Sequence, residues 1–150
     1  YYVLSYTFMT VGAFALVSLV AKDGKEETQL EDLRGLWRRS KVAAGCLLVF
    51  MVSLIGLPPT SGFVGKLLIF QDAIKVGLVP LAVLLAVSSI VSVTYYLNIA
   101  YQATIADTDA EMPRFAAFRP AIQSACVICA VAVVAVVFFF SPLTQFLGSR

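Results

Sequence analysis

Residues 54 to 66 read LIGLPPTSGFVGK, and this stretch decides the fold. Two prolines and three glycines interrupt an apolar run that extends from residue 42 to residue 74, and a lysine follows the interruption. As one straight helix these 33 residues would be about 50 Å long, whereas the hydrocarbon core of a bilayer is about 30 Å thick. Two crossings and a turn would need more residues than the run contains. We therefore predict one discontinuous transmembrane helix over 42–74, broken at residues 58–62.

The composition of the whole chain is that of an integral membrane protein. Of the 150 residues 60% are hydrophobic and 13% are charged, and the mean hydropathy is +0.90. Six of the eleven basic and five of the nine acidic residues fall within 22–41, whereas 1–21 and 76–106 carry no charge. The sequence thus predicts an all-α protein with about four transmembrane helices. These are 1–21, the discontinuous 42–74, 79–103 and 121–140, joined by loops 22–41 and 104–120 and followed by a tail, 141–150.

The loop over 22–41 is predicted to end in an amphipathic segment at the membrane surface. Leu30, Leu33 and Trp37 have the spacing i, i+3 and i+7, which places them on one face of a short helix, with Trp37 at the depth of the lipid headgroups. Basic residues are concentrated in this loop and in 104–120. By the positive-inside rule both loops are predicted to be cytoplasmic.

The sequence also argues against several kinds of site. A net charge of +2 with both signs interspersed gives no basic surface for nucleic acid. Cys126 and Cys129 lie in a continuous apolar segment and the chain has no histidine, so we predict that they are packing residues rather than metal ligands. Because the chain starts at Tyr1 without an initiator methionine, we expect it to be a piece of a longer protein.

The break itself is predicted to create a polar site. Unwinding a helix in hydrocarbon leaves backbone groups without partners, at several kcal/mol each, unless protein or water supplies those partners. Prolines have no N–H to lose, hydroxyls can bond freed carbonyls, and glycines let the backbone bend. Transporters build ion sites from such broken helices. The predicted break residues are Gly56, Pro58, Pro59, Thr60, Ser61, Gly62 and Gly65.

Lys66 lies about one turn beyond the break and is the candidate proton relay. A charged lysine near the bilayer centre costs about 2.5–3.5 kcal/mol, and desolvation favours its neutral form, so it can release a proton near neutral pH. In the alternative interpretation its side chain extends toward Lys75 and the outer interface as a simple anchor. The residues alone therefore indicate a membrane transport subunit for protons or a small cation.

Three segments resemble a known family. GLPPTSGFVGKLLIF at 56–70 resembles the broken helix of the antiporter-like subunits of respiratory complex I and of Mrp-type cation/proton antiporters. SYTFMTVGAFALVSL at 5–19 and EDLRGL at 31–36 resemble the N-type subunits (subunit N) of bacterial NADH-quinone oxidoreductase. In this family M-type subunits carry glutamate at the position of Lys66, and L-type subunits tend to have an acidic residue where this chain has Leu67. One departure is Lys41, which stands where the family often has proline.

The resemblance implies the C-terminal part of a 14-helix antiporter-like fold. It implies a proton-translocating subunit of the enzyme NADH:quinone oxidoreductase, in which quinone reduction elsewhere drives proton pumping through a channel containing Lys66. No redox site and no metal are expected in this chain. NADH, FMN, iron–sulfur clusters and quinone are expected in other subunits. The implied surroundings are the bacterial inner membrane, its lipid and the neighbouring membrane subunits of complex I.

The onward proton route is predicted to use water and hydroxyls, since histidine is absent. The candidates for this hydrated path are Ser88, Ser92, Thr94, Tyr95 and Tyr96. Two other functions stay open. One is the D-type component of an Mrp-type cation/proton antiporter, which also has a glycine-lysine pair here. The other is a structural membrane subunit without its own channel.

Overall fold

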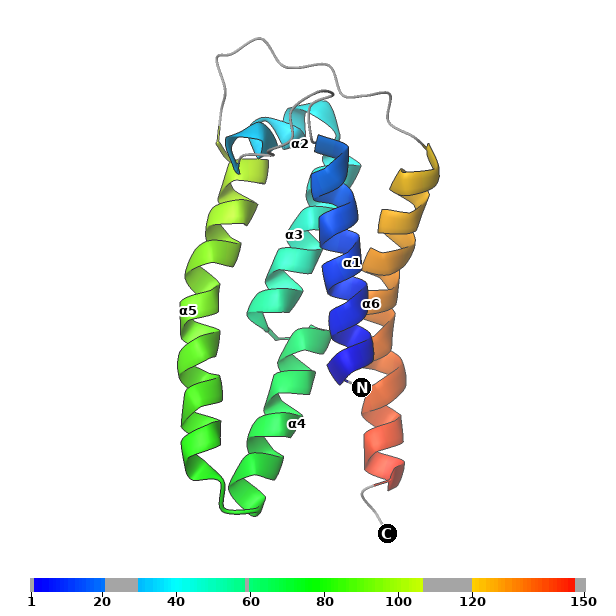
Figure 1. Ribbon diagram of the computed structural model, residues 1–150. Coiled ribbons are helices and arrows are strands. Elements are labelled where there is room, and N and C mark those ends of the chain that lie inside the picture. The colour runs from blue at the N-terminus through cyan, green and yellow to red at the C-terminus, as the bar shows by residue number, and fades with distance from the viewer. Residues whose placement is uncertain (1, 21–29, 59, 107–119, 148–150) are drawn as a thin grey trace.

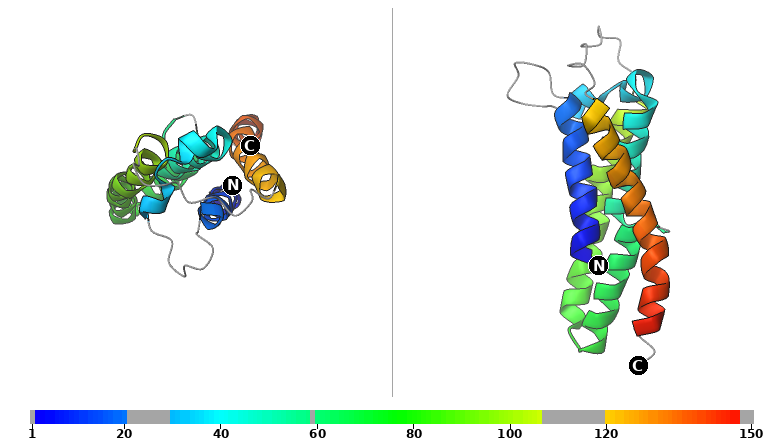
Figure 2. Two further views of the ribbon diagram at one scale, coloured as in Figure 1. Left: turned by 90° about the horizontal axis from the view of Figure 1, so that it is seen from above. Right: turned by 90° about the vertical axis from the view of Figure 1, so that its right-hand side faces the viewer.

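The computed structural model describes residues 2–20, 30–58, 60–106 and 120–147. The predicted loop residues 22–29 and 107–119, the break residue Pro59 and the tail residues 148–150 lie outside this description. The described residues form helices and connecting turns without strands, which confirms the predicted all-α class. The long helices run side by side in a narrow bundle (Figures 1 and 2). The elements are α1 (Tyr2–Val20), η1 (Leu30–Leu33), α2 (Leu36–Arg39), α3 (Lys41–Ile55), α4 (Ser61–Lys75), α5 (Val79–Thr104) and α6 (Pro120–Leu147).

Helices α3 and α4 together form the predicted discontinuous helix. They lie end to end and together extend along the bundle (Figure 1). Gly56 ends α3 with φ of 85°, a left-handed conformation that glycine adopts without a Cβ penalty. Thr60 begins α4, and its Oγ1 accepts a hydrogen bond from the Phe63 N–H at 3.4 Å. The break thus starts at Gly56, upstream of the predicted residues 58–62.

A tight turn folds α5 back alongside α4. Gly77 has φ of 77°, and its N–H donates to the carbonyl oxygen of Ile74 at 3.0 Å, which closes the end of α4. Pro80 lies in the first turn of α5, where its missing N–H would have no helical partner. This hairpin brings the middle of α5 to the break between α3 and α4 (Figure 1).

The helices differ in the length of their apolar stretches. Among the described residues only α5 is both long and apolar enough to cross a bilayer by itself. Shorter apolar stretches occur in α1, α3 and α6. For α3 this follows from the break, since α3 and α4 share one crossing. The prediction for α6 needs correction, because the helix continues through Ser141 and Pro142 to Leu147 instead of ending at residue 140. A proline removes only one helical N–H donor, and helices in membrane proteins tolerate that loss.

The segment before α3 is two short helices rather than one amphipathic helix. Gly35, with φ of 72°, separates η1 from α2 and changes the direction of the chain. Leu33 and Leu36 are therefore buried, with 3% and 1% of their surface exposed, whereas Leu30 and Trp37 are 37% and 42% exposed. The predicted apolar face of Leu30, Leu33 and Trp37 is wrong for this reason.

Both short helices lie across one end of the bundle (Figure 1). The Arg34 Nε donates a hydrogen bond to the Oε1 of Gln102 at 2.8 Å, and the Gly35 N–H donates to the carbonyl oxygen of Ala106 at 3.3 Å. Ser40 then caps α3 by accepting a hydrogen bond from the Ala43 N–H at 3.3 Å. The segment therefore links the start of α3 to the end of α5.

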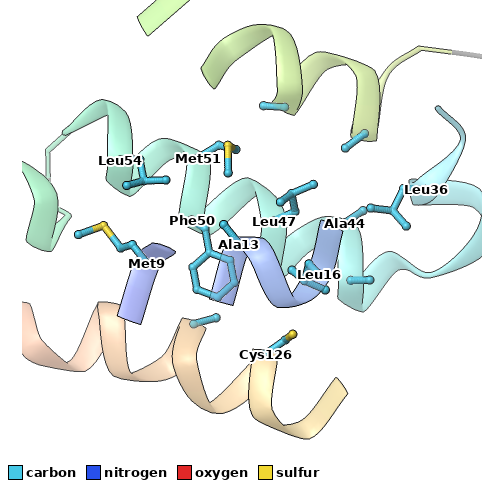
Figure 3. Packing of buried hydrophobic residues seen from close by; sticks show 14 of the residues in the cluster. Met9, Ala13, Leu16, Leu36, Ala44, Leu47, Phe50, Met51, Leu54 and Cys126 are labelled. Atoms are coloured by element: carbon cyan, nitrogen blue, oxygen red, sulfur yellow. The ribbon is translucent and has the colours of Figure 1, made fainter. Parts of the chain in front are cut away.

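The apolar core lies between α1, α3 and α6 (Figure 3). Phe50 of α3 is fully buried, and its ring packs on Gly12 so closely that a Cβ there would overlap the ring. Met9, Leu16 and Cys126 surround it. The burial of Cys126 agrees with its predicted packing role. This core fixes α3 against α1 and leaves the break accessible from the side of α5.

Candidate functional site

Lys66 of α4 caps the end of α3. Its Nζ donates hydrogen bonds to the carbonyl oxygens of Leu54 and Ile55, both at 3.0 Å. The last carbonyls of a helix have no helical partner and form the negative end of its dipole. The ammonium group of Lys66 therefore satisfies two such carbonyls and lies where a positive charge is stabilised.

This geometry bears directly on the anchor interpretation of Lys66. The side chain turns back to the break rather than toward Lys75 at the far end of α4. Lys75 itself pairs with Asp72 at 3.5 Å, and both side chains are about three-quarters exposed, at 73% and 74%. The two lysines of α4 thus have different surroundings, one at a helix break and one at an exposed helix end.

Ser53 holds the other half of the break together. Its Oγ accepts a hydrogen bond from the Gly62 N–H at 3.4 Å and lies 3.4 Å from the Oγ of Ser61. Both serines are fully buried. A Cβ on Gly62 would overlap the carbonyl oxygen of Ser53, so only glycine allows α4 to approach α3 this closely. Side chains therefore hydrogen-bond to both helix ends at the break. Ser53 accepts from the start of α4, and Lys66 donates to the end of α3.

A polar pocket, which we call the Lys66 pocket, opens between α1, α3, α4 and α5. Its volume is about 190 Å³. The predicted path residues Ser88, Ser92, Tyr95 and Tyr96 line it with Lys66, whereas Thr94 does not. Tyr2, Tyr6, Leu54, Leu85 and Ser89 complete the lining. The structure thus brings four of the five predicted hydroxyls to the lysine.

Three hydroxyl residues of this pocket are not among the predicted path residues, namely Tyr2, Tyr6 and Ser89. The two tyrosines are spaced i, i+4 on α1, which places them on one face, and their rings stack with centroids 5.8 Å apart. That spacing is visible in the sequence, but nothing local indicates that this face of α1 turns toward Lys66. Ser89 is adjacent to the predicted Ser88 in a pair of serines.

The serines of α5 offer acceptors to the pocket. Ser88 and Ser89 donate to the carbonyl oxygen of Leu85 at 2.9 and 2.8 Å, and Ser92 donates to that of Ser89 at 2.7 Å. Because each hydroxyl proton is used within the helix, the remaining lone pairs can accept from water or from an ammonium group. The pocket has the polar partners and the space that several water molecules need.

A second pocket adjoins Lys66 on the side of α4. It has a volume of about 210 Å³ and is mostly apolar, with Phe63, Leu67 and Phe70 from α4 among its lining residues. Lys66 lines both pockets and so lies in the wall between them. Within the described ranges no three His, Cys, Asp or Glu residues gather as a metal site.

A bundle of apolar helices, with one helix broken beside a partly buried lysine, is typical of membrane transport proteins that use discontinuous helices. Residues 1–92 match the family described as "NADH:quinone oxidoreductase/Mrp antiporter, TM". The chain therefore belongs to the NADH:quinone oxidoreductase/Mrp antiporter transmembrane family.

Individual relatives show which subunit type within this family the chain resembles. NADH-quinone oxidoreductase subunit N of Salinibacter ruber is 39% identical over 154 residues, covering 97% of this chain and 31% of the relative. Subunit N of Halorhodospira halophila is 36% identical over 137 residues, covering 89% of this chain and 28% of the relative. These matches confirm the predicted resemblance to subunit N.

A solved structure shares the fold. A chain of respiratory complex I from Thermus thermophilus with bound aureothin superposes with a TM-score of 0.74 at 34% identity, covering 89% of this chain and 31% of that chain. The present chain thus spans about a third of the length of the relatives that match most of it.

Proposed function

We propose that this chain is the C-terminal part of a proton-translocating membrane subunit of an NADH-quinone oxidoreductase, in which Lys66 binds and releases the translocated proton. The observation that carries the proposal is the position of Lys66. Its Nζ bonds the last carbonyls of α3 at 3.0 Å, and its side chain forms part of the wall between two pockets. The family and the subunit N relatives support the proposal.

The capping geometry offers a two-position mechanism. Protonated Lys66 is held at the end of α3 by two charge-assisted hydrogen bonds and by the helix dipole. When the proton leaves, the charge that strengthens these contacts is lost, and the amine lone pair requires a donor. Water in the Lys66 pocket can supply that donor. The protonation state of Lys66 thereby selects whether its amine lies at α3 or in the pocket.

The remaining parts of the enzyme belong to other chains in this proposal. NADH, FMN, iron–sulfur clusters and quinone are bound by other subunits, and this chain has no redox site. Its partners are neighbouring membrane subunits and bilayer lipid in a bacterial inner membrane, with residues 22–41 and 104–120 on the cytoplasmic side. Support comes from the matching chain of respiratory complex I and from relatives that are themselves bacterial.

The test is Lys66→Met in the full-length subunit, assembled into the whole complex and reconstituted in liposomes. We expect fewer protons pumped per NADH oxidised, because methionine keeps an unbranched side chain of similar size but binds no proton. Lys75→Met, at the exposed end of α4, is the matched control and should leave the ratio unchanged. An unaltered ratio in Lys66→Met would refute the relay and favour a structural role.

A further inference from the structure

Two tyrosines separate the Lys66 pocket from another pocket along α1. This third pocket, which we call the α1 pocket, has a volume of about 220 Å³. Tyr6 of α1, Leu54 of α3 and Tyr96 of α5 line both pockets, so they form the wall between them. The residues of α1 that line the α1 pocket extend from Tyr6 to Val17. Along this direction α1 runs toward the end of the bundle that carries η1 and α2 (Figure 1).

The polar part of this wall is a pair of hydroxyls. The Tyr6 and Tyr96 side chains both line the two pockets, and their hydroxyls interact electrostatically with each other, as does the Tyr95 hydroxyl with that of Tyr96. Neighbouring rings hold the pair in place, since Tyr2 stacks on Tyr6 at 5.8 Å and Tyr95 lies 4.4 Å from Tyr96, measured between ring centroids. A tyrosine hydroxyl both donates and accepts hydrogen bonds, so two of them in one wall can relay a proton from one pocket to the other.

The two sides of the wall differ in chemistry. The Lys66 pocket presents serine and tyrosine oxygens, whereas the α1 pocket is lined mainly by Ala13, Phe14, Val17, Met51 and Ile99. The Thr10 hydroxyl, which also lines the α1 pocket, donates to the carbonyl oxygen of Tyr6 at 2.7 Å. An apolar passage of this kind holds water poorly. A continuous water column through both pockets would conduct protons at all times, and the apolar lining with the tyrosine wall interrupts it.

We propose that the Tyr6–Tyr96 hydroxyl pair is the gated proton-transfer contact between the Lys66 pocket and the end of the bundle that carries η1 and α2. This inference rests on the proposed function of Lys66. When water enters the α1 pocket, it delivers a proton to the Tyr6 oxygen while Tyr6 passes its own proton to the Tyr96 oxygen. Tyr96 passes its proton to water in the Lys66 pocket, and that water protonates neutral Lys66. Each hydroxyl gains one proton and loses one, so no tyrosinate remains.

The test uses Tyr6→Phe and Tyr96→Phe in the full-length subunit within the liposome-reconstituted complex. Each variant keeps the ring and removes only the hydroxyl. We expect the ratio of protons pumped to NADH oxidised to fall to the level of Lys66→Met, with no further fall in the double variants. Tyr101→Phe is the control, because Tyr101 of α5 is 51% exposed and lines neither pocket.

A second variant tests the gate itself. Tyr6→Ala removes the ring that Tyr6 contributes to the wall as well as the hydroxyl, so we expect passive proton entry into liposomes without NADH to rise above the rate seen with Tyr6→Phe. If both phenylalanine variants pump normally while Lys66→Met does not, the proposed transfer through Tyr6 and Tyr96 is overturned. The proposed function of Lys66 is then unaffected. Normal pumping in Lys66→Met would overturn both. Equal passive leak in Tyr6→Ala and Tyr6→Phe would overturn the gating step.

Discussion

The Nζ of Lys66 lies 3.0 Å from the carbonyl oxygen of Leu54, so a side chain of α4 completes the end of α3 across the break. The contact joins residues from two helices. The position of the Lys66 ammonium group therefore depends on the shape of the break, and the stability of the break depends on the hydrogen bonds of Lys66. Substitutions at the break and in the core beside it are therefore expected to change both stability and pumping.

Lys66→Met is expected to destabilise the assembled complex as well as to lower pumping. The carbonyl oxygens of Leu54 and Ile55 would lose their donor, and an unsatisfied buried acceptor costs about 1–3 kcal/mol. A lower temperature of thermal inactivation measures the effect. Lys75→Met removes only an exposed ion pair, worth about 0–1 kcal/mol, and serves as the control. Equal stability of the two variants would contradict the capping role.

Gly56→Ala is expected to impair both the break and the lysine. The left-handed conformation at φ of 85° costs alanine about 1–2 kcal/mol, and the added Cβ would lie 3.2 Å from the Lys66 Cδ. Pumping should fall because the lysine side chain must move. Gly45→Ala on the same helix meets no atom within 4 Å and should be neutral or stabilising by about 0.5–1 kcal/mol. Proton pumping and thermal inactivation of the pair are the measurements.

Gly62→Ala is expected to prevent normal assembly. The new Cβ would overlap the carbonyl oxygen of Ser53, which is backbone and cannot turn aside, so α4 must move away from α3. Ser53→Ala removes only the hydroxyl that accepts from the Gly62 N–H, at a cost of about 0.5–1.5 kcal/mol. The amount of intact complex on a native gel should follow the order wild type, Ser53→Ala, Gly62→Ala. A reversed order of the two variants would show that the close approach at Gly62 is unimportant.

Phe50→Ala is expected to loosen the packing of α1 on α3. Removing a fully buried phenylalanine costs about 3–5 kcal/mol, since the surrounding core collapses only in part. Leu48→Ala on the same helix is the control, because Leu48 is 38% exposed and contributes less buried surface. The measurement is the denaturant or temperature needed to release the subunit from the complex. Similar losses for both variants would contradict the central position of Phe50.

The break could be predicted because it follows from the length of the apolar run, and the sequence itself shows that Lys66 lies beside it. An apolar run too long for one crossing and too short for two must be interrupted, and the prolines show where. The hydrogen-bond partners of Lys66 could not be predicted in the same way. They depend on the left-handed turn at Gly56, which ends α3 and sets the path by which the chain brings Lys66 of α4 to the last carbonyls of α3.

The errors in the prediction also have physical causes. A helical spacing does not hold across Gly35, whose positive φ redirects the chain and buries Leu36 instead of Trp37. Pro142 does not end α6 at residue 140, because membrane helices tolerate a proline where neighbouring groups satisfy the freed backbone. Tyr6 is not predictable from spacing within one helix, because its contact with Tyr96 joins α1 to α5.

The attachment of the η1–α2 segment to both α3 and α5 has a mechanical consequence. Ser40 and the Arg34–Gln102 hydrogen bond hold the surface end of α3, while Lys66 holds its opposite end. The fifteen residues of α3 form a rigid helix about 22 Å long. A tilt of only about 3° at the surface would move the carbonyl of Leu54 by about 1 Å, enough to break a hydrogen bond. A displacement of the η1–α2 segment can thus reach Lys66 through a single rigid helix.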